Sequence, residues 1–249
     1  QGPARLAVPY TEFTLANGLH VILHRDASVP IVTVNVWYHV GSGSEKPGRT
    51  GFAHLFEHLM FEGSKHVPEG SFDTWLEGAG ANNNGSTTVD RTNYYIDGPS
   101  NALELMLFLE SDRMAYLLDT MTPERVNGQR DVVKNERRQS YENRPYGMPE
   151  LELDAMLFPP GHPYSWSTIG SMEDLSAASH DDVQQFFRTY YAPNNASLVI
   201  GGDIDVAATK ALVEKWFAEI PRGTPVLPVA PPAAMLTGVL CLLFVACYV

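Results

Sequence analysis

The sequence predicts an α+β fold, a layered domain in which helices cover a mainly antiparallel sheet. Residues 13–15 and 19–24 flank Asn17-Gly18, a pair that favours a two-residue hairpin turn. Residues 31–40 alternate apolar and polar side chains, as does a strand with one buried face. The strands and helices that follow show no regular βαβ repeat, which disfavours a doubly wound parallel sheet.

The later elements are predicted from periodicity, caps and turn residues. Thr122 and Pro123 suit the cap and first position of a helix that Pro145 ends. The run rich in glycine and asparagine over residues 78–85 reads as a loop. The predicted helices cover residues 50–63, 71–78, 101–118, 122–142, 151–158, 171–175, 180–191 and 206–220, and the further strands cover 86–89, 92–97 and 197–201.

Composition indicates a globular protein that does not bind polyanions. The 249 residues are 44% hydrophobic, enough for a buried core. Asp plus Glu number 29 against 17 Lys plus Arg, a formal charge of −12 that is unfavourable for nucleic acid or an anionic membrane. A protein with this charge is better suited to bind basic or neutral polypeptides. The two cysteines, Cys241 and Cys247, form no framework for the main body.

The chain divides into three parts by composition. Residues 1–220 form the predicted domain, residues 221–235 a proline-rich linker, and residues 236–249 an apolar tail without a charge. As a helix the tail would span about 21 Å, short of the roughly 30 Å hydrocarbon core, so no membrane span is expected. An added strand, a buried tail or a dimer contact fits it better. The first residue, Gln1, fits an exported bacterial protein, periplasmic or secreted, after removal of a signal peptide.

The strongest chemical signal lies in the first predicted helix, which Thr50 would cap and Gly63 would end. His54 and His58 are four residues apart, so one helix face presents both imidazoles to a single metal ion. Glu57 lies in the same turn and is placed to act as a general base. The order His-x-x-Glu-His is the inverzincin signature. The alternative is that these are ordinary polar residues of an amphipathic helix.

A third ligand is needed, because catalytic zinc takes three protein ligands and an open position. Glu136 lies beside the apolar stripe of the helix over residues 122–142. It is either a solvated boundary residue or a buried carboxylate that requires a partner such as the metal. His20, His24 and His39 lack a partner at ligand spacing and are expected to pack or to face solvent. His162, in a proline-rich loop and also without such a partner, is not expected to be a ligand.

With these motifs in family order, the chain resembles the pitrilysin or insulinase-like family of zinc metallopeptidases, over residues 10–235. It is most similar to exported bacterial members related to the mitochondrial processing peptidase. The residues that carry the resemblance are residues 54–58, Asn83-Asn84-Gly85-Ser86-Thr87-Thr88 and residues 132–138.

The resemblance implies a zinc-dependent endopeptidase acting on peptides or unstructured polypeptides. His54, His58 and Glu136 would hold Zn²⁺, and Glu57 would activate a zinc-bound water. Gln129 stands where many members have a glutamate that supports the site, so this support would lack charge. Substrate would add as a strand at Asn83, Asn84, Gly85, Ser86 and Thr87.

Family members enclose substrate between two halves, each of two such domains, and this chain matches one domain. The alternative function is therefore a truncated or non-catalytic partner subunit that needs a second half, or another copy, to form the substrate chamber. An intact His-x-x-Glu-His favours the enzyme.

Overall fold

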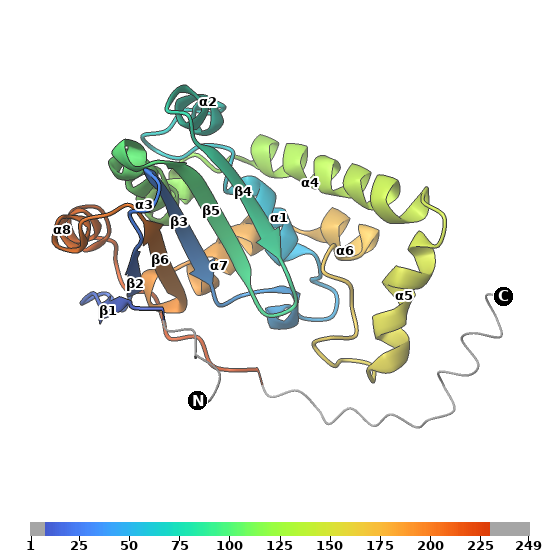
Figure 1. Ribbon diagram of the computed structural model, residues 1–249. Helices are drawn as coiled ribbons and strands as arrows, with labels where there is room; N and C mark the ends of the chain where they lie inside the picture. Colours follow the sequence, from blue (N-terminus) through green and yellow to red (C-terminus); the bar gives the residue numbers. More distant parts are fainter. Residues whose placement is uncertain (1–7, 230–249) are drawn as a thin grey trace, which may run out of the picture.

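The computed structural model describes residues 8–229 and contains one open, six-stranded sheet in the order β1-β2-β6-β3-β5-β4. Only the β2–β6 pair is parallel among these strands, so the predicted α+β class with a mainly antiparallel sheet is confirmed (Figure 1). The strands are β1 (Thr11–Thr14), β2 (His20–Arg25), β3 (Ile31–Tyr38), β4 (Asn82–Thr87), β5 (Thr92–Pro99) and β6 (Ala196–Gly202).

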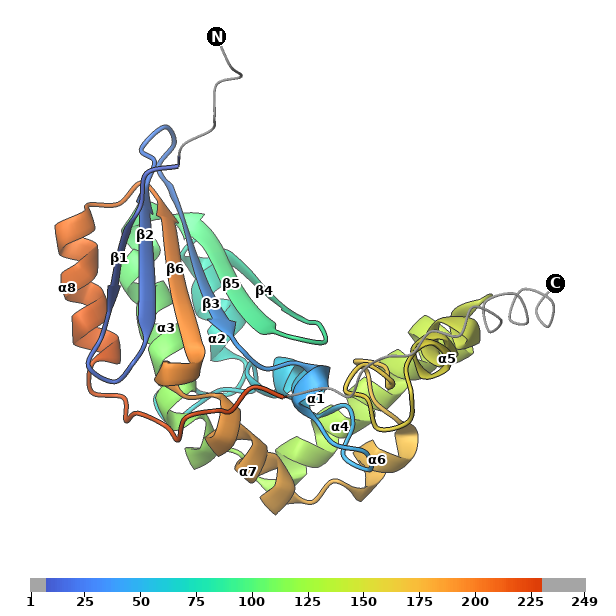
Figure 2. The same ribbon diagram turned by 90° about the horizontal axis from the view of Figure 1, so that it is seen from below.

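One face of the sheet carries the core. In β3 the residues Val32, Val34, Val36 and Tyr38 are buried and alternate with more exposed neighbours. Helices α3 (Leu103–Tyr116) and α8 (Val206–Phe217) pack on this face and on each other (Figure 2). The opposite face, turned to the viewer in Figure 1, is crossed by no helix of the described chain.

The first hairpin is confirmed, but its turn differs from the prediction. Thr14 pairs with His20, so the connecting loop spans five residues and not two. Gly18 alone takes the positive φ, 94°. The side chain of Asn17 is buried and donates to the carbonyls of Phe217 and Ile220 at 2.8 and 2.9 Å. This contact with the end of α8, 200 residues away, decides the conformation of the turn.

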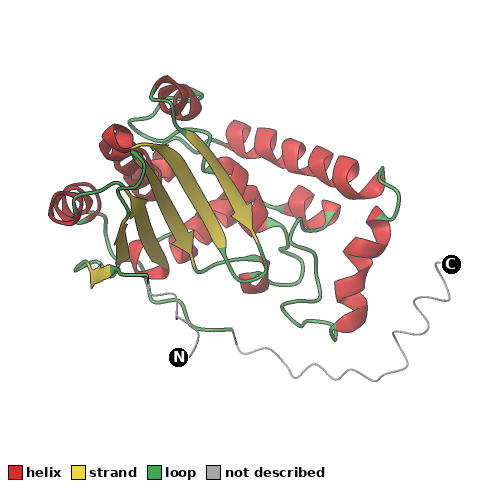
Figure 3. Ribbon diagram, in the orientation of Figure 1, coloured by secondary structure: helices red, strands yellow, loops and turns green. Residues whose placement is uncertain are grey.

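Helices α4 (Pro123–Arg137), α5 (Gly147–Leu157) and α6 (Met172–Ala177) lie beyond the edge strand β4 and lead away from the sheet (Figure 3). In Figure 1, α1 lies between β4 and α4, and α1 packs against both. Helix α4 continues through a π-helical turn at Arg138–Glu142 towards α5. The elements are α1 (Phe52–Leu59), α2 (Ser71–Gly78), α4 (Pro123–Arg137), α5 (Gly147–Leu157), α6 (Met172–Ala177) and α7 (His180–Tyr190), with 3₁₀ turns at Ser42–Ser44, Ser100–Ala102, Leu117–Asp119 and Pro193–Asn195.

The prediction of a loop over residues 78–85 is wrong from Asn82 onwards, because β4 begins there. Asn82, Asn83, Asn84 and Gly85 pair with Asp97, Ile96, Tyr95 and Tyr94 of β5. Asparagine and glycine have low strand propensity, and pairing with a neighbouring strand overrides it. These polar residues therefore lie on an edge strand beside α1.

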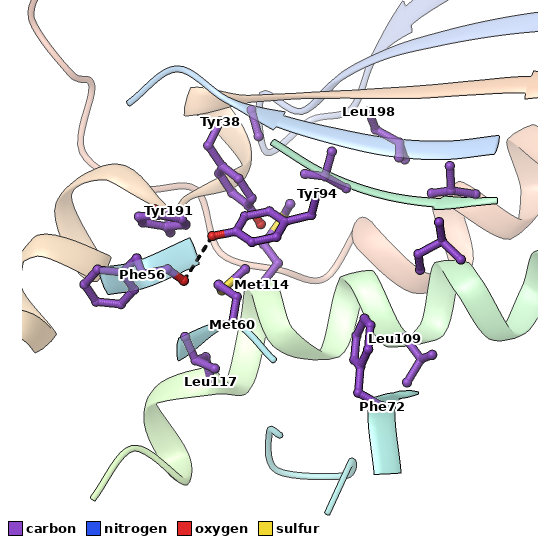
Figure 4. Close-up of a cluster of buried hydrophobic side chains, with 14 of the residues drawn as sticks. Tyr38, Phe56, Met60, Phe72, Tyr94, Leu109, Met114, Leu117, Tyr191 and Leu198 are labelled. Atoms are coloured by element: carbon purple, nitrogen blue, oxygen red, sulfur yellow. Dashed lines mark hydrogen bonds between the residues drawn. The ribbon is translucent and has the colours of Figure 1, made fainter. Parts of the chain in front are cut away.

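Aromatic side chains fix α1 against the sheet. Tyr94 of β5 is fully buried and its hydroxyl donates to the carbonyl of Phe56 in α1 at 3.1 Å (Figure 4). Phe56 and Tyr191 pack with ring centroids 5.1 Å apart. The backbone between His54 and Glu57 is therefore held from the core side.

The last described helix ends at Phe217 and the last core residue is Ile220. Residues 221–229 form no helix or strand, and Gly223 donates to Asn194 at 2.7 Å. The rest of the predicted linker and the apolar tail over 236–249 lie outside the described residues. No helix within residues 8–229 has the length and apolar character needed to cross a membrane.

Candidate metal and active site

Helix α1 begins without the predicted Thr50 cap. Gly51 is the N-cap residue, at φ 88°, and contributes no side-chain hydrogen bond. The buried Glu45 carboxylate accepts instead from the backbone N–H groups of Gly51 and Ala53, at 2.9 and 2.8 Å. The Thr50 hydroxyl donates to Asp174 at 2.6 Å. A residue from the preceding loop therefore satisfies the N–H groups that open the helix.

The two histidines face one acceptor, as their spacing predicts. Nε2 of His54 lies 3.6 Å and Nε2 of His58 3.2 Å from Oε2 of Glu136. The two rings are 4.9 Å apart at an interplanar angle of 83°. Within residues 8–229, these three side chains are the one group of three or more potential ligands found within 4.8 Å of one another.

Helix α4 brings Glu136 to the histidines from 78 residues further along the chain. Thr122 accepts from the N–H of Arg125 and Pro123 occupies the first turn, as predicted. The α-helix ends at Arg137, and a π-helical turn follows. Glu136 is half-buried, so the structure places it at the junction of α4 and α1 and not on a fully solvated surface.

The donor set fits a zinc ion. Ligand atoms about 2.1 Å from a tetrahedral zinc lie about 3.4 Å from one another. The two N–O distances in this cluster bracket that value. Nδ1 of His54, the nitrogen turned away from Glu136, is buried without a hydrogen-bond partner among the described residues. Two imidazoles and one carboxylate are ligands that zinc accepts, with a position left open for water.

Electrostatics favour the protonation states that bind metal. Burial lowers the pKa of the His54 imidazole, although the nearby carboxylates of Glu136 and Glu57 oppose the effect. A hydrogen bond from His58 lowers the pKa of the Glu136 carboxyl, against partial burial. A neutral imidazole and an ionised carboxylate are the forms that coordinate.

Glu57 lies between the candidate ligands and the edge strand. Its Oε2 accepts a 2.5 Å hydrogen bond from the Thr87 hydroxyl of β4. At Gly85 a Cβ atom would lie 3.1 Å from Cγ of Glu57, so the strand backbone approaches the carboxylate closely. Glu57 is thus oriented by the strand that the sequence predicts to receive substrate.

The predicted substrate-binding residues all lie on β4. The Asn84 side chain accepts from the N–H of Gly85 at 2.8 Å, so this N–H points to the free edge of the sheet. Asn83 donates to Asp73 at 2.9 Å, and Ser86 donates to Asn93 at 2.7 Å. An open pocket of about 360 Å³ adjoins the start of the strand; it is lined by Phe61, Asp73, Glu77, Ala81, Asn82, Asn83 and Asn84.

Gln129 is linked to the site through Glu62, a residue without a predicted role. Its amide donates to Glu62 at 2.6 Å. Glu62 lies four residues after His58, beyond the end of α1, and burial raises the pKa of its carboxyl. Its short separation from His58 in the sequence was the available signal. The Gln129 amide is therefore paired with a carboxylate close to His58.

His20, His24, His39 and His162 lie outside the cluster. His162 is buried, stacks on Phe158 and accepts from the N–H of Tyr164. His39 bonds Ser197, and His24 bonds the carbonyl of Pro9. His20 pairs with Glu12 at 3.4 Å. These contacts agree with the packing or surface roles expected from their spacing.

The fold is that of the insulinase class of proteins. The family described as insulinase (peptidase family M16) matches residues 20–156, more than half of the chain, and the chain belongs to this family. The description of the second matching model, over residues 177–240, is the peptidase M16 inactive domain.

The relatives are proteases of about twice this length. The zinc protease PqqE of Helicobacter pylori is 34% identical over 213 residues, which are 83% of this chain and 46% of the relative. The mitochondrial-processing peptidase subunit beta of Blastocladiella emersonii is 27% identical. The match covers 89% of this chain and 47% of the length of that relative. The chain thus spans about half the length of these curated relatives.

Solved structures share the fold. A protease from Helicobacter pylori matches with a TM-score of 0.81 and 31% identity over 92% of this chain and 54% of that one. The periplasmic protease PqqL from Escherichia coli has the same TM-score at 23% identity, covering 92% of this chain and 26% of its own. The second likeness concerns the fold alone.

Proposed function

We propose that the chain is a zinc-dependent endopeptidase domain that hydrolyses peptides or unstructured polypeptides. The observation that carries the proposal is the convergence of His54, His58 and Glu136 on one point, with Glu57 in the adjacent helical position. The relatives that are proteases support the reaction class.

The chemistry divides between the metal and the chain. Zinc held by the three ligands would supply a Lewis acid for the scissile carbonyl and would lower the pKa of water. Glu57 takes the proton of the attacking water and returns it to the leaving amine. Thr87 holds the Glu57 carboxylate by its 2.5 Å hydrogen bond and so limits its rotation.

We propose that substrate binds as an added strand along the free edge of β4. Backbone hydrogen bonds at such an edge bind an extended peptide with loose sequence preference. The outward N–H of Gly85 and the approach of its backbone to Glu57 support this arrangement, because a peptide paired there would pass the base. The Asn84 side chain would have to release the Gly85 N–H for pairing.

A second candidate is a partner subunit that needs another half to complete a substrate chamber. The observation that favours it is the match to about half the length of the relatives. Light scattering distinguishes a monomer from an assembly with a second copy. The proposed location is periplasmic or secreted in a bacterium, and the structurally similar Escherichia coli protease PqqL is itself periplasmic.

The test measures zinc content and cleavage of an unstructured peptide, with and without a chelator. Glu57→Gln keeps the three ligands and removes the base, so it should retain near-stoichiometric zinc and lose at least about 100-fold in kcat. Glu136→Gln should lower zinc content. Glu214→Gln, the same change on the exposed face of α8, is the matched control and should equal the wild type.

Two outcomes would count against the proposal. Unchanged cleavage by Glu57→Gln would exclude this residue as the base. A wild-type protein without zinc would favour the non-catalytic partner subunit, whereas zinc without cleavage would indicate a formed site that awaits its second half.

A further inference from the structure

Residues 169–174, here the bridging segment, contact both helices that carry the candidate ligands. On the α1 side, the Gly170 and Gly51 backbones are so close that a Cβ on Gly170 would overlap Gly51. Asp174 accepts from the N–H and hydroxyl of Thr50 at 3.0 and 2.6 Å. The N–H of Ser171 donates to the same hydroxyl at 3.1 Å. The start of α1 is thus fixed to the bridging segment.

On the α4 side the contact is made by Arg137, the residue after Glu136. Its Nη1 donates to the Gly170 carbonyl at 2.6 Å. Its Nε donates to Glu142 at 3.1 Å, within the π-helical turn that follows α4. The Arg137 side chain is 14% exposed. A partly buried, charge-assisted hydrogen bond to a fixed carbonyl restricts both side chain and backbone.

We propose that Arg137 is a positioning residue for the metal site, acting through the Gly170 carbonyl to fix Glu136 relative to His54 and His58. The inference rests on the proposed zinc site. The candidate ligands come from two helices, α1 and α4, that pack against each other, so small sliding of α4 would separate Glu136 from the imidazoles. The bridging segment opposes this sliding, because Gly170 contacts Gly51 and Arg137 simultaneously.

The test is zinc affinity by competition with a chromophoric chelator, using purified full chain. Arg137→Gln should weaken zinc binding by about 10–100-fold, the usual effect of removing a group that orients a ligand. Arg138→Gln removes the same charge from the next residue, whose exposed side chain bonds Asn135, and should change affinity less than about twofold. Apo-protein melting temperatures measured with excess chelator separate a site effect from general destabilisation.

Thr50→Val tests the other end of the bridging segment by removing the hydroxyl between Asp174 and Ser171. It should weaken zinc binding several-fold, and it becomes the deciding variant if Arg137→Gln does not fold. Wild-type affinity in either folded variant, or an equal loss in Arg138→Gln, would overturn the inference. Absence of zinc binding in the wild type would instead overturn the proposed function on which it rests.

Discussion

Glu45 is a buried carboxylate at the start of the site helix, where two opposing effects act on its charge. The N–H groups that open α1 favour the anion. Burial, with a smaller contribution from the nearby Asp174 carboxylate, outweighs the effect of these N–H groups and raises the pKa of Glu45 to about 8. Tyr190 and Tyr191 are the other titratable groups whose pKa values respond to Glu45. The raised pKa therefore favours the protonated form of this carboxyl at neutral pH.

The raised pKa predicts a pH dependence of stability. Between pH 4.5, the ordinary pKa of a glutamate, and about pH 8, the folded state holds this proton more tightly than the unfolded chain. The free energy of unfolding should therefore fall as the pH rises through this window. The contribution is roughly 3–5 kcal/mol, since one pKa unit corresponds to about 1.4 kcal/mol.

Thermal melts of wild type and Glu45→Gln at pH 5 and pH 8 measure this effect. The substitution keeps an oxygen acceptor for the helix and removes the titration, so the stability difference between the two proteins should narrow or reverse at pH 8. Glu214→Gln should follow the wild-type profile. Parallel profiles for wild type and Glu45→Gln would show that Glu45 does not titrate in this window.

Among the elements, β4 joins the sheet to Glu57, the proposed general base. It is an edge strand, and it contacts α1 through Gly85 and Thr87. Because the Gly85 N–H points outward, alternate residues such as Asn83 also direct their N–H to the free edge. Proline is tolerated where an edge N–H faces solvent. A proline can therefore replace an outward-facing residue of β4. It removes an N–H from the free edge and leaves the hydrogen bonds to β5 in place.

Asn83→Pro should raise KM for an extended peptide by about tenfold, the effect of losing one backbone hydrogen bond of about 1.4 kcal/mol. Zinc content should stay at the wild-type level. Asn83→Ala is the control, because it loses the side-chain bond to Asp73 and keeps the backbone N–H. Steady-state kinetics would refute strand addition at this residue if both variants cleaved equally well.

The two ends of helix α4 are fixed by different kinds of interaction. Its cap at Thr122 is set by local sequence, whereas its last residues, Glu136 and Arg137, are fixed by α1 and by the bridging segment. The change to a π-helical turn directly after them places Glu142 against Arg137. Such turns are frequent at functional sites.

For the whole molecule, the formal charge of −12 would act on every encounter with the proposed peptide substrates. A negatively charged protein attracts cationic peptides at long range, and salt screens the attraction. We expect kcat/KM for a lysine-rich unstructured peptide to fall several-fold as NaCl rises from about 0.05 to about 0.5 M. A neutral peptide of the same length should change little, and equal salt dependence for both would remove the electrostatic explanation.

Local sequence was sufficient for most of the helices and for three of the four residues of the candidate site. Period and caps placed α2, α3, α4 and α7 to within a few residues of their observed bounds. His54, Glu57 and His58 could be assigned together because one helical turn fixes their separation. The family resemblance added Glu136, whose role spacing alone left open.

Tertiary structure decided what depends on segments far apart in the chain. Only the packing of α1 on α4 brings Glu136 within 3.2 Å of His58, only the pairing with β5 makes a strand of Asn82–Thr87, and only the fold brings Glu45 to the start of α1 in place of Thr50. The physical reason is the range of the interactions. Helical periodicity and capping residues act over a few neighbours, whereas burial, strand pairing and metal ligands depend on contacts that the finished fold creates.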